Sequence, residues 1–328
     1  MPYYPPREPG PNGNGQEPKK PSAPRARYVR IALACLSAVL ILYGGIRLAG
    51  YFRELNESRD TSRELQQIRE QTEPPADAGT AEATPTVTPV RATEALPAVT
   101  PGQTAAEQPA GKEGILPPVP YPDNPGLKVP ARFVQLRRKS GYIIGWLSLD
   151  GVEEAVGLKD NTFFLNHDVT GKRNSNGAIF LDEAVSLLNR PYTIYLYGHN
   201  MKSGNMFGKL KKYLDSSYCF KHRIITFDSL YEEGKYAVFA AAEFNTVPGT
   251  ATWLDLWALN SNRLEEREEA IRSLTALSPY GNVLDVRGDE QILLLITCID
   301  RDTDRLVVAA RRLREGETEE RLTFRKAP

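Results

Sequence analysis

The prolines of this 328-residue chain are concentrated in two stretches, and this distribution limits how much of the chain can fold. Of 25 prolines, eight lie in the first 24 residues and twelve lie between Pro74 and Pro125, whereas only four lie between residues 130 and 316. Proline-dense stretches with few large apolar residues cannot bury enough surface to offset the entropy of ordering the backbone. One folded domain is therefore predicted over residues 128–316, followed by a C-terminal tail over 317–328.

Charge and cysteine content exclude several classes of protein. The chain has 41 basic and 41 acidic residues and a formal net charge of zero, so it lacks the basic surface of a nucleic-acid binder, and no nucleic-acid partner is predicted. Three cysteines are too few for a disulfide scaffold. The three histidines are too scattered for the usual ligand spacing of a zinc site, so no metal site is predicted. His167, His222 and Cys219 are interpreted as structural residues.

Sixteen uncharged residues from Ile31 to Ile46 form a hydrophobic run near the N-terminus. A membrane-spanning helix needs about 17 to 25 residues. The residues up to Phe52 supply this length if Arg47 extends its charge toward the lipid headgroups. A cleaved signal peptide is the alternative, but Arg47 occupies the place where small residues would form the cleavage site. We therefore predict a transmembrane anchor over residues 31–52.

The residues on either side of this run predict its orientation. Six basic and two acidic residues precede it, so by the positive-inside rule the disordered tail over 1–30 lies in the cytoplasm. The rest of the chain is then extracellular, in a single-pass protein of the cell membrane. Residues 53–127 are expected to form a polar, solvated helix and then an extended spacer rich in Pro, Thr and Ala.

The folded domain is predicted to consist mainly of short strands. Short strand-like runs occur in seven places, most of them punctuated by Gly, Asn or Asp, namely YIIGWLSLDG, GAIFLD, YTIYLYG, RIITFD, GKYAVFAAAEF, QILLLITC and RLVVAARRL. LDGVEEAVG (149–157) is interpreted as a turn. Helices are predicted at ARFVQLRRKSG, GNMFGKLKKYLD and NRLEEREEAIRSLTALS. Many short strands indicate a closed or sandwich-like β architecture.

Three polar residues at strand ends form a candidate catalytic site. Cys298 ends one apolar run and His199 follows another, so both would emerge where strands leave the core. A nucleophilic cysteine needs a histidine or a cation nearby. Arg305 opens the next strand, and a hairpin would return it close to Cys298, where it could hydrogen-bond an oxyanion. Packing remains the alternative for Cys298, because free cysteine is commonly buried.

Four segments resemble class B sortases. LLLITC (293–298) is similar to the TLxTC signature of sortases, with Leu294 where threonine is usual. YLYGHNMKSGNMFGKLKKYLD (195–215) resembles the histidine segment of class B, and DRLVVAARR (304–312) resembles the strand that carries the family arginine. LKDNTFFLNHDVTGKRNSNGAIFLD (158–182) resembles the block that precedes the histidine segment.

The order of these segments argues against related enzymes. Papain-like peptidases place their cysteine before their histidine, whereas here the histidine comes first. Class C sortases are expected to carry a second hydrophobic span, and residues 317–328 contain none. The chain also departs from the family in two places beside the expected groove. The turn at 149–157 is short, and LDEAVS (181–186) lacks the usual aromatic residue and arginine, so both departures bear on specificity.

The resemblance implies a fold and a set of functional residues. The fold would be mostly β with helices (α+β), a sortase-like closed β-barrel of about eight strands with an N-terminal helix and a long helix before the cysteine strand. Cys298 would be the nucleophile, His199 the proton donor and acceptor, and Arg305 the group that stabilises the oxyanion. The implied substrate-binding residues are Asn161, Leu165, Tyr197, Thr297 and Asp300, the last of which could also orient His199.

The resemblance also implies a reaction and its partners. A class B sortase is a cysteine transpeptidase that cleaves a C-terminal sorting signal, NPxTN-like by class, after its threonine. It then joins the secreted protein to an amine of a peptidoglycan precursor and requires no cofactor. Two alternatives stay open, a membrane-tethered binding module with the sortase fold but no catalysis, and a cysteine peptidase that only hydrolyses.

Overall fold

The computed structural model describes residues 23–72, 114–118, 120–281, 283–298 and 303–323. Residues up to Arg53 and residues from Glu54 onward form two compact units. The first unit contains the apolar part of helix α1 (Ala23–Thr72), which is long and apolar enough to cross a membrane. One such helix is present in the described part of the chain, at the place where the sequence predicts the anchor.

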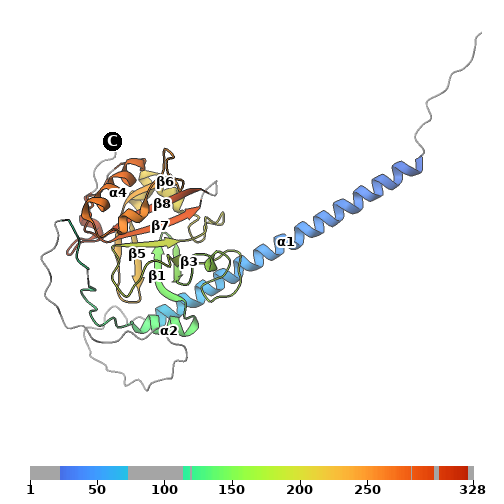
Figure 1. The fold of residues 1–328 in the computed structure, drawn as a ribbon. Helices are drawn as coiled ribbons and strands as arrows, with labels where there is room; N and C mark the ends of the chain where they lie inside the picture. Colours follow the sequence, from blue (N-terminus) through green and yellow to red (C-terminus); the bar gives the residue numbers. More distant parts are fainter. Residues whose placement is uncertain (1–22, 73–113, 119, 282, 299–302, 324–328) are drawn as a thin grey trace, which may run out of the picture. The chain divides into compact units, whose positions relative to one another are not determined.

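Eight strands of the second unit close into a barrel (Figure 1). The order around the barrel is β1-β2-β3-β4-β7-β8-β6-β5. This confirms the predicted closed barrel of about eight strands. The strands are β1 (Ile143–Leu149), β2 (Val152–Gly157), β3 (Ile179–Leu181), β4 (Thr193–Tyr197), β5 (Ile224–Ser229), β6 (Lys235–Asn245), β7 (Ile292–Cys298) and β8 (Asp304–Arg312).

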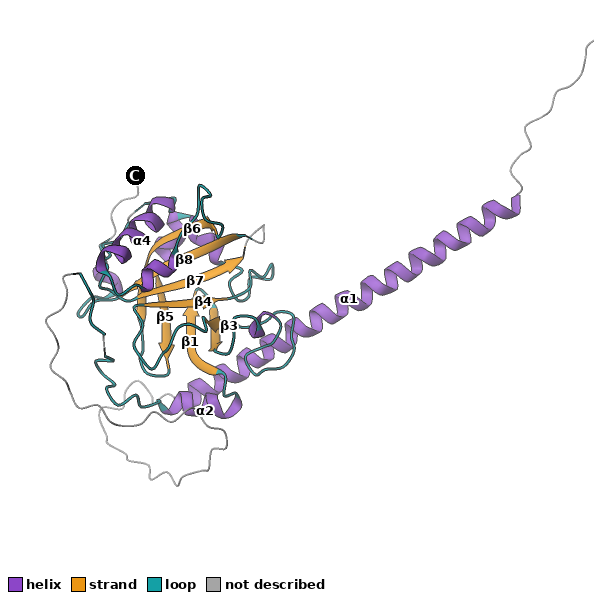
Figure 2. Cartoon of the chain, viewed as in Figure 1, coloured by secondary structure: helices purple, strands orange, loops and turns teal. Residues whose placement is uncertain are grey.

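Helices lie around this barrel (Figure 2). The long helix α4 precedes the cysteine strand β7, as predicted, and packs against β6. Strands β6, β7 and β8 are almost continuous apolar runs because their side chains are buried on both faces, and α4 packs against β6 while η2 contacts β6 and β8. Besides the end of α1, the helices of this unit are α2 (Ala131–Lys139), α3 (Ser216–Lys221) and α4 (Leu264–Leu277), with 3₁₀ turns η1 (Phe163–Leu165), η2 (Leu210–Leu214), η3 (Leu256–Asn260) and η4 (Glu319–Arg321).

The segment interpreted as a turn contains a strand. β2 pairs with β1 through a tight turn at Asp150 and Gly151, and both turn residues have positive φ. Glu153 and Glu154 interrupt its apolar pattern, which explains the missed strand. Both carboxylates have partners, since Glu153 accepts hydrogen bonds from Trp146 Nε1 (2.8 Å) and Glu154 accepts one from a serine of α1 (2.7 Å). Burial nevertheless raises the pKa of Glu154 to about 7.

The prediction of a solvated helix after residue 52 is wrong for the residues that face the barrel. Leu55 and Leu65 of α1 are buried, with 6% and 1% of their surfaces exposed, and Leu65 belongs to the hydrophobic core of the domain. Arg69 lies between Glu153 and Asp228, at 3.5 Å and 3.3 Å. The apolar stripe is thin, as the sequence indicates, but hydrogen bonds and ion pairs supply the remaining contacts.

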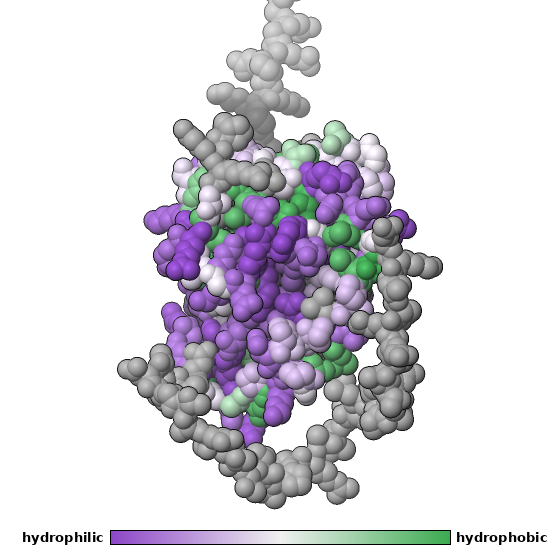
Figure 3. All heavy atoms as spheres, turned by 90° about the vertical axis from the view of Figure 1, so that its left-hand side faces the viewer, coloured by the Kyte–Doolittle hydropathy of each residue, from purple (hydrophilic) through white to green (hydrophobic). Residues whose placement is uncertain are grey.

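The folded part therefore begins earlier than the predicted boundary at residue 128. Besides the end of α1, residues just before α2 contact the domain. Leu116 N donates to the carbonyl of Asn262 (2.7 Å), and the buried Tyr121 donates its hydroxyl to the carbonyl of Leu187 (2.7 Å). The face of the molecule in Figure 3 carries mostly hydrophilic side chains between smaller apolar patches.

Candidate active site

Strands β7 and β8 bring two of the predicted catalytic residues together. The strands pair antiparallel, and Cys298 and Arg305 are register partners at the end of the ladder. The predicted hairpin is therefore present. The backbone of Cys298 is described as the last residue of β7, whereas its side chain lies outside the described part. Asp300 also lies outside the described residues.

Strand β4 delivers the third residue to the same end of the barrel. β4 and β7 run parallel, with Tyr197 opposite Ile296, so their following residues emerge side by side. Gly198 N donates to the carbonyl of Ile296 (3.3 Å), and Thr297 Oγ1 donates to the carbonyl of Gly198 (2.7 Å). These bonds extend the pairing beyond the strand. His199 is thus fixed next to the end of the cysteine strand.

The imidazole of His199 is held from two sides. Its Nε2 lies 2.8 Å from the carbonyl oxygen of Leu165, within hydrogen-bond distance. Gly177 lies against the ring, since a Cβ there would be 2.9 Å from His199 Cδ2 and would overlap the carbonyl oxygen of Phe164. Gly177 also has a φ of +65°, a conformation that L side chains rarely adopt. Both its geometry and its surroundings therefore require glycine.

A cavity of about 260 Å³ opens beside these residues. It is lined by His199 and Arg305 together with four of the five predicted substrate-binding residues. Apolar walls with a few polar groups are typical of ligand pockets, and here the apolar walls come from Ala178, Phe180 and Ile296. The predicted residues in this lining are Asn161, Leu165, Tyr197, Thr297, His199 and Arg305.

Asp182 also lines the cavity, although the sequence analysis did not predict it as a site residue. Its side chain is buried, with 3% exposed, and its Oδ2 accepts a hydrogen bond from Asn161 Nδ2 (3.2 Å). Burial raises the pKa of Tyr197, and the charge of Asp182 and its hydrogen bond to Tyr197 act in the same direction. Asp182 directly follows the apolar strand β3. The same signal, a polar residue at the end of a buried strand, identified His199 and Cys298.

The other histidines and the second cysteine of the domain lie elsewhere. Cys219 is buried, as interpreted, and burial raises the pKa of its thiol to about 11. The ring of His167 stacks on Phe163 at a centroid distance of 4.1 Å. His222 Nδ1 lies 3.1 Å from Asp150 Oδ1 at the β1–β2 turn.

Comparisons with known proteins find relatives of this domain. Residues 158–313 match the family model described as a sortase domain. The sortase B of Listeria monocytogenes is 26% identical over 187 residues, which cover 56% of this chain and 72% of that protein. The sortase B of Staphylococcus aureus is 28% identical over 186 residues, which cover 55% of this chain and 74% of that protein.

Solved structures show the same similarity. A crystal structure of S. aureus sortase B matches with a TM-score of 0.50 and 27% identity, over 57% of this chain and 89% of that one. Sortase B of Bacillus anthracis matches with a TM-score of 0.50 and 27% identity, over 60% of this chain and 88% of that one. Residues 158–313 therefore form a sortase domain, the domain of a cysteine transpeptidase, and the chain is similar to sortase B proteins.

Proposed function

We propose that Cys298, His199 and Arg305 carry out transpeptidation at a sorting signal near the C-terminus of secreted proteins. One observation supports this most directly. The end of β7, the end of β4 and the start of β8 meet at one edge of the barrel, beside a cavity that His199 and Arg305 line.

In the proposed first step, the Cys298 thiolate attacks the carbonyl carbon of the signal's threonine. A carbon–sulfur bond forms, the peptide carbon–nitrogen bond breaks, and protonated His199 gives its proton to the departing amine. Arg305 would donate hydrogen bonds to the oxyanion of the tetrahedral intermediate or to the signal backbone. The product is a thioester between the secreted protein and Cys298.

The second step would resolve this thioester with an amine of a peptidoglycan precursor. His199 takes a proton from the incoming amine, a new amide forms, and the Cys298 thiolate leaves. The secreted protein is then attached covalently to the wall. Asp300 could orient His199 during these proton transfers.

The groove residues would hold the signal in place for this attack. An NPxTN-like pentapeptide presents backbone amides and small polar side chains, which suit the amide of Asn161 and the hydroxyls of Tyr197 and Thr297. Leu165 would supply apolar contact. The Asn161 amide is already oriented, since its Oδ1 accepts from Glu183 N (3.0 Å) while its Nδ2 donates to Asp182. Such orientation reduces the entropy that binding costs.

The membrane arrangement is part of the proposal. Residues 1–30 would lie in the cytoplasm, residues 31–52 would span the membrane, and the domain from residue 54 onward would lie outside the cell. This orientation follows from the excess of basic residues before the apolar stretch. Secreted proteins and wall precursors meet on that side.

The test is cleavage and transfer by the full chain in detergent micelles. Quenched pentapeptides with NPxTN-like sequences are incubated with and without an amine nucleophile, and the products are identified by mass spectrometry. We expect cleavage, an amide-linked product when the amine is present, and a loss of about 10³-fold or more in the Cys298→Ala variant. Cys219→Ala is the matched control, because Cys219 is a buried thiol away from the cavity. Cleavage that survives in Cys298→Ala would refute the nucleophile assignment.

A further inference from the structure

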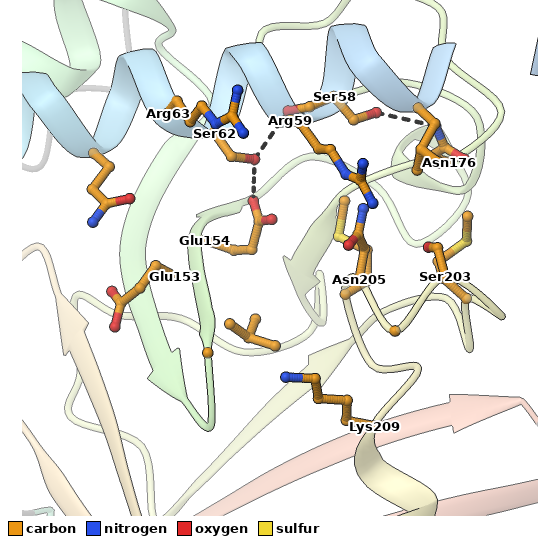
Figure 4. A pocket seen from close by; sticks show the side chains of 17 residues that line it. Ser58, Arg59, Ser62, Arg63, Glu153, Glu154, Asn176, Ser203, Asn205 and Lys209 are labelled. Atoms are coloured by element: carbon orange, nitrogen blue, oxygen red, sulfur yellow. Dashed lines mark hydrogen bonds between the residues drawn. The ribbon is translucent and has the colours of Figure 1, made fainter. Parts of the chain in front are cut away.

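The end of α1 lies over two loops that position His199. One is the turn Asn174–Gly177, and the other is the segment from Met201 to Lys209 that follows His199. Both contribute to a cavity of about 450 Å³ whose other walls are α1 from Leu55 to Gln66 and residues 151–154 at the start of β2 (Figure 4). Figure 4 shows Ser58 directed from α1 at Asn176, while Ser62, one turn later, is directed at Glu154.

Ser58 is the centre of a buried hydrogen-bond network between α1 and the turn. Its Oγ accepts from Asn174 Nδ2 (3.0 Å) and from Asn176 Nδ2 (3.1 Å) and donates to the carbonyl of Glu54 (3.0 Å). Ser58, Asn174 and Asn176 have only 7%, 1% and 2% of their surfaces exposed. A buried amide that loses its acceptor costs about 1–3 kcal/mol, so this serine strongly favours one arrangement of the turn.

A second contact holds the same turn from the same helix. Glu54 accepts hydrogen bonds from the backbone N–H of Ser175 (3.2 Å) and from the Ser175 hydroxyl. Within the turn, Asn176 N donates to Asn174 Oδ1 (2.9 Å) and Gly177 N donates to the carbonyl of Asn174 (3.0 Å). The position of Gly177 is therefore tied to α1 through Asn174.

Gly177 connects this network to His199. Its Cα faces the imidazole so closely that a Cβ would lie 2.9 Å from Cδ2. The next residue, Ala178, donates its N–H to the carbonyl of Phe164 (3.0 Å), and the carbonyl beside that one, on Leu165, is the partner of His199 Nε2. The turn thus fixes both the surface that the ring packs against and the carbonyl that orients it.

We propose that α1 from Glu54 to Ser58 is a working part of the active site, in which Ser58 is a positioning residue for His199. The inference rests on the proposed function, because it assigns the ring a proton-transfer role. Ser58 touches no reacting atom. It holds the Asn174–Gly177 turn, and the turn holds the imidazole. Docking of the helix that continues from the predicted anchor is then a condition for catalysis, and a fragment that begins at residue 128 lacks it.

The test compares Ser58→Ala with Ser62→Ala in the full chain in detergent micelles. The two serines lie four residues apart on the same helix, but Ser58 hydrogen-bonds the turn whereas Ser62 hydrogen-bonds Glu154 of β2. For Ser58→Ala we expect kcat on a quenched sorting peptide to fall about 10- to 100-fold with KM within about threefold, because small displacements of a catalytic group are costly. For Ser62→Ala we expect kcat within about threefold of wild type at a similar loss of thermal stability.

Imidazole spectra give a readout that does not depend on activity. The chain has three histidines, so a ¹H–¹³C spectrum of the imidazoles contains three pairs of signals. Ser58→Ala should displace or broaden the His199 signals and leave those of His222, which lies beside Asp150, unchanged. Ser62→Ala should leave the His199 signals in place.

Several outcomes would overturn the inference. One is a Ser58→Ala variant with wild-type kcat and unmoved His199 signals. Another is an equal fall of kcat in Ser58→Ala and Ser62→Ala, which would indicate a general effect of lower stability. If Ser58→Ala does not fold, Glu54→Ala replaces it, since Glu54 holds the same turn from a less buried position. We expect its kcat to fall about tenfold and its His199 signals to move, and a kcat within about threefold of wild type with unmoved signals would decide against the inference. A wild-type chain that cleaves no peptide would instead refute the proposed function, while the spectra would still test the positioning.

Discussion

Two histidines of this domain illustrate opposite ways of holding an imidazole. His222 caps the C-terminal end of α3, with its Nδ1 3.1 Å from Asp150 Oδ1. The same carboxylate accepts a hydrogen bond from Tyr218 and lies 3.6 Å from Lys209 Nζ. His199 Nε2 instead lies within hydrogen-bond distance of the backbone carbonyl of Leu165, with Gly177 against the ring, and His199 borders an open cavity.

The difference separates a structural histidine from one suited to proton transfer. The carboxylate beside His222 is typical of a contact that ties a turn to a helix. The carbonyl of Leu165 orients the ring of His199 without adding a charge, and the cavity beside the ring leaves room for a substrate. In this protein, His222, which stabilises the fold, has an acidic partner, whereas His199, which lines the groove, is confined by its neighbours.

The largest expected effect on activity comes from removing the imidazole of His199, and removing that of His222 should have the opposite pattern. His199→Ala should lower kcat by about 10³-fold, because general acid–base groups contribute about 10²- to 10⁴-fold, with little change in thermal stability. His222→Ala should show the reverse, with kcat within about threefold and an unfolding free energy lower by about 1 kcal/mol. Peptide cleavage and thermal unfolding of both variants check this. Equal activity losses in the two variants would end the distinction.

Gly177 tests whether confinement of the ring matters. Gly177→Ala places a Cβ against His199 and Phe164 at a φ of +65°, so we expect kcat to fall by about 10- to 100-fold and stability to fall by about 2 kcal/mol. Gly281→Ala is the matched control, because its φ is +62° but its Cβ would meet no described atom within 4 Å. It should lose only about 1 kcal/mol and keep its kcat. A Gly177→Ala variant as active as Gly281→Ala would show that the ring tolerates displacement.

Much of this arrangement could be predicted from the sequence, because buried strands carry their own signal. The apolar runs of β4 and β7 each end at a polar residue, and this pattern located His199 and Cys298. Their proximity follows from the parallel pairing of β4 and β7, which brings equivalent strand ends to one edge. The pattern failed at β2, where Glu153 and Glu154 obtain partners from distant segments that no local pattern reveals.

The surroundings of His199 could not be predicted, for a related reason. Its partner on Leu165 is a main-chain carbonyl, which every residue possesses. The role of α1 depends on Ser58, a residue type that is common on exposed helices, and its significance appears only when the buried amides of Asn174 and Asn176 are placed around it. Polar networks between distant segments leave no periodicity in a sequence, whereas apolar strands do.

Asp150 provides the smallest and most specific test, since its effect depends on pH. The hydrogen bond from Tyr218 lowers the pKa of Asp150 below its ordinary 3.8, burial opposes this, and the charges of His222 and Lys209 lower the pKa further. The folded state thus favours the ionised carboxylate. Its contribution is fully present above the unfolded pKa and disappears as the pH falls through the lower folded pKa.

Asp150→Asn should therefore be less stable than wild type by about 1 kcal/mol at pH 7, and the gap should close as the pH falls below the ordinary pKa of 3.8. Asparagine tolerates the φ of +24° at this position, so the substitution tests charge and not backbone strain. Thermal unfolding midpoints of both chains between pH 3 and 7 measure the gap. Cleavage at pH 7 should change by less than about threefold, because the pair stabilises the fold and does not border the groove. A gap that persists at low pH would mean that the charge of Asp150 is not what stabilises the turn, and a large loss of cleavage would mean that its carboxylate also serves the reaction.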